Sequence, residues 1–211
     1  MTGFASGQRI ETDQGLVPVE ALRPGMMVRT LHNGFCAVKA VLSTPISQAA
    51  LAMSPDKCPV TLPAVCGFRP LSVAGDHHMM LEGWAVELIV GQSEGLARAR
   101  RLQDPDPIQD WFQTGVTYVH IILENHQILC VEGQWSGSHF ITVDDEVLLD
   151  DAWARVNRNL PALPEFELHS STALMCLSAF ETKAVLNYLG RSPAQVFVDP
   201  VGHTDAQRLQ A

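Results

Sequence analysis

Three histidines, His77, His120 and His126, are the residues of this chain best suited to acid–base or metal chemistry. A carboxylate, a further imidazole and a thiol lie close to them in sequence, in Asp76, His78 and Cys130. Such side chains together can bind zinc or a similar ion. If His120 and His126 lie on one strand, their even spacing places them on the same face. One hypothesis is therefore a metal-binding module that uses His77, His120 and His126.

Composition limits the class of protein that can carry these histidines. The chain has 211 residues, 46% apolar and 18% charged, which is a globular mixture long enough to bury a core. Its formal charge of −9 argues against a nucleic-acid partner, because an acidic chain gains nothing from counterion release. We expect a cytoplasmic protein without a membrane span, secretory signal or cofactor, and an unknown protein partner is compatible with the sequence.

Neither the cysteines nor the arginine cluster indicates a site. The five cysteines are scattered and form no CxxC pair, which predicts reduced thiols and not a zinc ribbon or a redox motif. The basic cluster Arg98, Arg100 and Arg101 is followed at once by Asp104 and Asp106, so we interpret it as a solvated surface.

Short strands are predicted from residue 9 to about 133, where turn residues recur between short apolar runs. Asn33-Gly34 predicts a two-residue hairpin turn. The longest apolar runs, Trp84–Val90 and Thr117–Val131, are taken as part of this β body. We expect a β domain over residues 1–150, an extension over 151–190 and a flexible tail over 191–211.

One helix is predicted near the C-terminus. Ser178 and Glu181 have the spacing of a capping box, in which each side chain bonds the other residue's amide. Val185, Leu186 and Leu189 then form an apolar stripe at helical spacing, and Gly190 suits a helix end. We expect this helix to pack on the β body.

The opening of the chain, GFASGQRIETDQGLVPVEALRPGMMV, resembles the first block of Hint domains, the fold shared by inteins and the autoprocessing part of hedgehog proteins. The closest likeness is to a bacterial Hint-like family of alphaproteobacterial type. The matching positions are Phe4, Gly7, Ile10, Thr12, Gly15, Pro18, Val19, Glu20, Leu22, Gly25 and Val28. Further matches follow at Arg69-Pro70-Leu71, His77, Gly83-Trp84, Tyr118, His120, His126 and Glu132-Gly133, and at Leu177-Ser178 to Leu189.

The resemblance implies an all-β, Hint-like horseshoe of two twisted β subdomains with a C-terminal helix. It also implies autoprocessing, which begins when a Cys or Ser side chain attacks the carbonyl before it. That step needs a histidine at the scissile amide, which the likeness assigns to His77, with a Thr or Ser three residues earlier. His120 and His126 are expected near the same cleft.

The sequence departs from this pattern at both critical positions. Gly3 occupies the nucleophile position without a side chain, and Ala74 stands where the family has a hydroxyl. No His-Asn pair suits a splice junction. The first hypothesis is therefore a degenerate, inactive Hint domain that serves as a binding or structural module, with its histidines as hydrogen-bonded remnants. The alternatives are self-cleavage or hydrolysis with His77 as general acid or base, and the metal-binding module.

Overall fold

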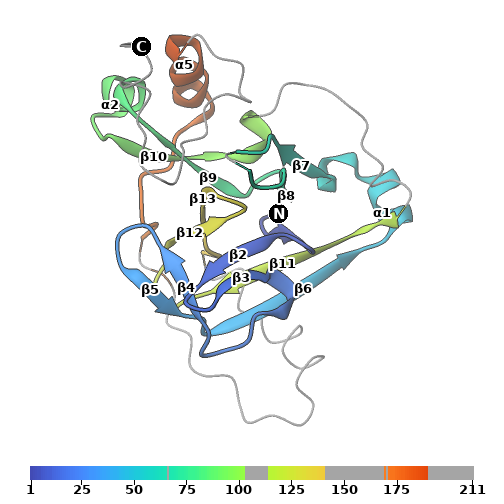
Figure 1. The fold of residues 1–211 in the computed structure, drawn as a ribbon. Coiled ribbons are helices and arrows are strands. Elements are labelled where there is room, and N and C mark those ends of the chain that lie inside the picture. The colour runs from blue at the N-terminus through green and yellow to red at the C-terminus, as the bar shows by residue number, and fades with distance from the viewer. Residues whose placement is uncertain (66, 103–113, 141–168, 170, 190–211) are drawn as a thin grey trace.

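The structure, a computed structural model, describes residues 1–65, 67–102, 114–140, 169 and 171–189. Over these ranges the chain is mainly antiparallel β-sheet, which confirms the predicted all-β class (Figure 1). The first sheet has five strands in the order β6 (Ala40–Ile46), β11 (Val116–Ile122), β1 (Phe4–Ala5), β8 (Leu71–Ala74) and β7 (Pro59–Leu62). The second has the order β10 (Glu94–Arg98), β9 (His78–Glu82), β13 (Gln134–Gly137), β12 (Ile128–Val131), β2 (Arg9–Thr12), β4 (Met27–Thr30) and β5 (Gly34–Ala37), with β3 (Gly15–Pro18) paired to β2.

Short helices connect and cover these strands. The α-helices of the described residues are α1 (Gln48–Met53), α2 (Trp84–Val90) and α5 (Ala179–Leu189). Three short 3-10 helices are η1 (Val19–Ala21), η2 (Pro55–Lys57) and η3 (Ala99–Arg101). None of the helices in the described ranges is both long enough and apolar enough to cross a membrane.

A single hydrophobic cluster joins the two sheets. Phe4 of β1, Ile10 of β2 and Val28 of β4 are almost fully buried in it. Val19 of η1 and Leu22, directly after η1, are buried in the same cluster. All five belong to the apolar positions of the opening motif. The glycines of the motif instead allow a backbone conformation that side chains disfavour. Gly7, Gly15 and Gly25 have φ of +90°, +101° and +89°. The opening motif thus supplies both the core residues and the turn glycines of the segment from β1 to β4.

Helix α5 confirms the predicted capping box. The Ser178 amide donates to Glu181 Oε2 at 2.7 Å, and the Glu181 amide donates to Ser178 Oγ at 3.2 Å. Val185 is fully buried in the core cluster shared with the strands, and the helix packs mainly against α2 and η3 (Figure 1). The preceding segment adds to β10 in parallel through a bridge between Leu96 and Cys176.

The run Trp84–Val90 is helix α2 and not a strand. Gly83 and Gly91 bound it with φ of +110° and +73°, and the Gly91 amide closes the last turn on the Glu87 carbonyl. Ala85 and Val86 are buried while Trp84 and Leu88 are exposed. Because two of the three exposed positions are also apolar, the sequence hides the helical period that would have identified this segment.

Two further details of the strands differ from prediction. The hairpin at Asn33-Gly34 has a three-residue loop, 31–33, because Thr30 pairs directly with Gly34. Thr30 Oγ1 accepts from the Asn33 amide at 3.2 Å, which stabilises this longer turn. The run Thr117–Val131 divides into β11 and β12 around the polar residues Glu124 and Asn125.

A buried carboxylate ties the second sheet to the loop before β8. Glu132 is fully buried and has φ of +45°, at a tight turn with Gly133 between β12 and β13. It accepts from Arg9 Nη2 at 2.7 Å and Arg69 Nη2 at 3.0 Å. Burial alone would raise the pKa of Glu132, but the hydrogen bonds from the two arginines outweigh it and lower that pKa.

We expect Glu132→Gln to lower the free energy of unfolding by about 3 kcal/mol, because it leaves two arginines facing an uncharged buried group. Denaturant titration at neutral pH measures this loss. The matched control is Glu124→Gln, since Glu124 pairs with Lys39 at 3.2 Å on an exposed surface. That variant should lose less than about 1 kcal/mol. Equal losses in the two variants would contradict a structural role for the buried network.

Candidate functional site

The site is centred on Gly3, which lies directly before the middle strand of the first sheet. In β1, Phe4 pairs with Val119 of β11 on one side and with Val73 of β8 on the other. Continuing both registers by one residue sets Gly3 beside His120 and Ala74. Figure 1 accordingly places the N-terminus near the middle of the fold, beside β8. The sheet therefore brings together three sequence positions that the family resemblance had singled out separately.

His77 holds the backbone of Gly3. The Gly3 amide donates to His77 Nδ1 at 3.2 Å, in a buried environment. The ring packs edge-on against Phe4 at 4.4 Å between centroids, and the His77 amide is bonded to the Ala74 carbonyl. Burial, followed by the charges of His78, His120, His126 and His139, holds the pKa of His77 well below its usual value. His77 is thus a neutral imidazole that accepts from the amide of the peptide bond between Thr2 and Gly3.

His120 faces the position where a side chain of residue 3 would begin. A Cβ built on Gly3 lies 3.1 Å from His120 Cε1 and 3.2 Å from both His120 Nδ1 and Tyr118 Cβ. Thr44 Oγ1 lies 3.0 Å from His120 Nε2, so β6 orients this ring. Gly3 also has φ of +116°, a conformation that side chains disfavour. The imidazole therefore adjoins the position of a side chain on residue 3, and the backbone there has a conformation that favours glycine.

Ala74 completes the immediate surroundings of Gly3. Its amide donates to the Gly3 carbonyl at 2.9 Å, and its side chain is buried. A threonine or serine at this position would place a hydroxyl beside the same segment. The two departures seen in the sequence, Gly3 and Ala74, therefore concern neighbouring positions of one site.

His126 does not share this arrangement. Strand β11 ends at Ile122, so His126 lies in the loop before β12 and not on the strand face of His120, as the even spacing had suggested. Its Nδ1 accepts from the Ala173 amide at 2.9 Å, and its ring contacts Phe140. The hydrogen bond from Ala173 to His126 thus attaches residues 171–189 to the β body.

Four further groups lie close to Gly3, and sequence reasoning missed two of them, Thr44 and His139. Thr2 Oγ1 lies 3.2 Å from His139 Nδ1, whose ring packs against His120 at 5.1 Å. The Asp76 amide donates to the Met1 carbonyl at 3.2 Å. Thr44 supports His120, as described above. Their only signal in the sequence is residue type, because the contacts join positions as much as 137 residues apart.

The metal hypothesis receives no support from the described residues, among which no group of three or more His, Cys, Asp or Glu side chains could hold an ion. Cys130 lies on β12, where burial first of all raises the pKa of its thiol to about 12. It therefore stays protonated and is a poor ligand. Four cysteines in the described ranges, Cys36, Cys58, Cys130 and Cys176, are free thiols, and Cys66 lies outside those ranges.

The arginine cluster, which the sequence indicated as a solvated surface, is partly exposed and also bonded to its surroundings. Arg98 and Arg100 both pair with the Asp76 carboxylate, and Arg101 Nη1 donates to the Leu177 carbonyl at 3.3 Å. Asp104 and Asp106 lie outside the described residues, as do half of the predicted 151–190 extension and all of the 191–211 tail.

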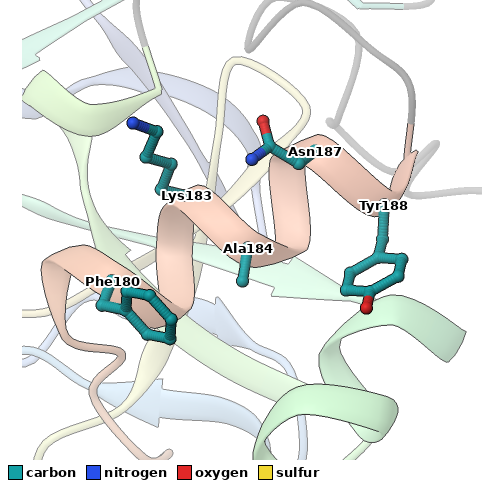
Figure 2. Close-up of a pocket in the computed structure, with 5 residues that line it drawn as sticks. All are labelled: Phe180, Lys183, Ala184, Asn187 and Tyr188. Atoms are coloured by element: carbon teal, nitrogen blue, oxygen red, sulfur yellow. The ribbon is translucent and has the colours of Figure 1, made fainter.

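A separate hollow lies on helix α5, away from Gly3. Figure 2 shows the residues that line it, Phe180, Lys183, Ala184, Asn187 and Tyr188. Tyr188 contacts Trp84 of α2 at 6.3 Å between rings, and both side chains are more than half exposed. The hollow holds no acid, thiol or imidazole, so it lacks the groups needed for acyl transfer.

Comparison with known proteins identifies the family. Residues 2–143, more than half of the chain, match the Hint domain family, and the chain therefore belongs to it. The structure is similar to the bacterial intein-like domain from Clostridium thermocellum, with a TM-score of 0.45 and 16% sequence identity, over 66% of this chain and 99% of that chain. No curated protein matches the chain significantly.

Buried His126 should make stability depend on pH. Burial, then the charges of His78, His169 and His139, lowers the pKa of His126 to about 4. The unfolded chain has a histidine pKa of about 6.5, so it binds more protons than the folded chain between these values. The free energy of unfolding should therefore fall as the pH drops from about 6.5 to about 4, with a contribution of up to about 3 kcal/mol from His126.

The test is denaturant unfolding from pH 7 to pH 4 for the natural chain and for His126→Asn. Asparagine retains an acceptor for the Ala173 amide but does not titrate in this range. The variant should lose less stability over the window. Parallel curves for the two proteins would show that His126 does not cause the pH dependence.

Proposed function

We propose that this chain is a Hint domain that no longer cleaves the Thr2–Gly3 peptide bond by an acyl shift at residue 3. The observation that supports it is the hydrogen bond from the Gly3 amide to His77 Nδ1, at 3.2 Å in a buried environment. This is the histidine-to-amide contact that self-cleavage requires. The nucleophile that would start the reaction is missing, since glycine has no side chain.

The retained imidazole explains what such a site could still do. In an acyl shift the amide nitrogen leaves as an amine and must gain a proton. His77 is placed at this nitrogen, but its lowered pKa keeps it neutral, so it acts as an acid only after receiving a proton. His120 would adjoin a thiol on residue 3 and could take the proton that the thiol loses.

A second candidate function is active self-cleavage or hydrolysis with His77 as general acid or base. The same contact favours it, because the histidine remains bound at the peptide bond. The opening motif further supports placing the chain in the bacterial, alphaproteobacterial type of Hint domain. The metal-binding alternative is not pursued, given the lack of a suitable ligand group in the described residues.

The function is tested with the full chain extended by a short peptide before Met1, followed by intact mass with and without dithiothreitol. We expect the natural sequence to stay intact at the Thr2–Gly3 bond. Gly3→Cys should lose the extension in a thiol-dependent reaction, slowed by the positive φ and the close contact with His120. Adding Ala74→Thr should speed this reaction, because it returns a hydroxyl beside residue 3.

Two matched variants separate chemistry from strain. Gly3→Ala introduces the same Cβ contacts without a thiol, so it should remain uncleaved. His77→Asn in the Gly3→Cys background should slow cleavage by a factor of about 100 or more. Thiol-dependent cleavage of the natural chain between Thr2 and Gly3 would overturn the proposal and favour the active alternative.

A further inference from the structure

Thr2, directly before the glycine, carries the kind of side chain that Gly3 lacks. Its Oγ1 lies 3.2 Å from His139 Nδ1. When the ring proton is on Nε2, Nδ1 accepts the hydrogen of the hydroxyl group. A hydroxyl paired with an imidazole is a recurring arrangement for activating a nucleophile, and threonine is among the residues that serve in it.

The carbonyl group that this hydroxyl would attack is also held. The Met1 carbonyl accepts from the Asp76 amide at 3.2 Å. The Asp76 carboxylate pairs with Arg98 Nη1 at 3.2 Å and with Arg100, and these pairs fix the turn that carries the amide. A backbone N–H directed at a carbonyl oxygen stabilises the negative charge that develops there during acyl transfer.

We infer that this chain has an acyl-shift centre displaced by one residue, with Thr2 Oγ1 as nucleophile toward the carbonyl carbon of residue 1. As Oγ1 bonds to that carbon, its proton passes to His139 Nδ1. The carbon–nitrogen bond to Thr2 then breaks, and the same proton moves from His139 to the Thr2 nitrogen. The product is an ester between residue 1 and Thr2 Oγ1 with a free Thr2 amine. Water hydrolyses the ester and releases the upstream segment as a carboxylic acid.

The surroundings hold both partners of this reaction. Gly3 is fixed by bonds to His77 and Ala74, so Thr2 is attached to a rigid neighbour. The His139 amide donates to the Ile121 carbonyl at 2.8 Å, and its ring packs against His120. Thr2 itself is only partly buried, which gives water access to an ester formed there.

This inference concerns a different peptide bond from the proposed function. Loss of the acyl shift at Gly3 leaves the bond between residue 1 and Thr2 untouched. The products also differ, because cleavage before Thr2 and cleavage before Gly3 leave fragments that differ by one threonine. Each proposal can therefore fail without the other.

The test uses the full chain extended before Met1, incubated folded at neutral pH with hydroxylamine, which cleaves esters but spares ordinary amides. We expect an upstream fragment that ends at residue 1 as a hydroxamate, identified by intact mass. Thr2→Ser should also react, since serine has the same hydroxyl. Thr2→Val has the same shape without the hydroxyl and should give no fragment.

The role of the imidazole is tested with His139→Phe, which retains a ring against His120. Removal of a general base should slow formation of the fragment at least tenfold. Thermal melting of each variant checks that the fold is retained, which is expected for Thr2 variants because Thr2 is only partly buried and lies outside the core. An intact natural chain under hydroxylamine, or an undiminished fragment from Thr2→Val, would rule out the displaced centre.

Discussion

The whole site depends on the antiparallel pairing of one very short strand. Strand β1 has two residues, Phe4 and Ala5, yet it is the middle strand of the five-stranded sheet. Its bonds to β8 and β11 set the peptide before Gly3 between elements that are distant in sequence. Burial of Phe4 in the shared core stabilises this position. A slip of one residue would turn Phe4 out of the core and move Gly3 away from His77.

The contact between His77 and residue 3 is made by the backbone, so it does not depend on the side chain at residue 3. Every residue except proline provides an amide hydrogen, so replacing the side chain leaves the bond intact. The fold therefore determines the hydrogen bond between the amide of residue 3 and His77, whereas the identity of residue 3 determines whether a side chain is present beside it. Glycine at position 3 lacks the side chain but keeps the backbone contact, and its positive φ is a conformation that other residues disfavour.

Sequence reasoning succeeded where local rules decide the structure. The apolar and glycine positions of the opening motif were identified through the family resemblance, and in the structure they are core residues and turn residues. The capping box at Ser178 is equally local. The family resemblance assigned His77 to the scissile amide, and in the structure His77 Nδ1 accepts from the Gly3 amide, a contact that no periodicity could show because 74 residues separate the two.

The failures also have physical causes. Trp84–Val90 is apolar on its exposed face as well as its buried one, so its helical period was hidden. His126 was placed with His120 because the strand was assumed to continue past Ile122. The pair of Thr2 and His139 depends on tertiary contact alone, and neither residue stands out in the sequence.

The position of β1 also sets the order in which the protein can fold. The partners of Phe4 are Val73 and Val119, so the pairing of β1 is completed only when β11 has been synthesised. Until then, its apolar residues and backbone groups are unpaired. Long-range pairing of this kind slows folding and prolongs exposure to aggregation. The site at Gly3 is therefore assembled only after β11 has been synthesised.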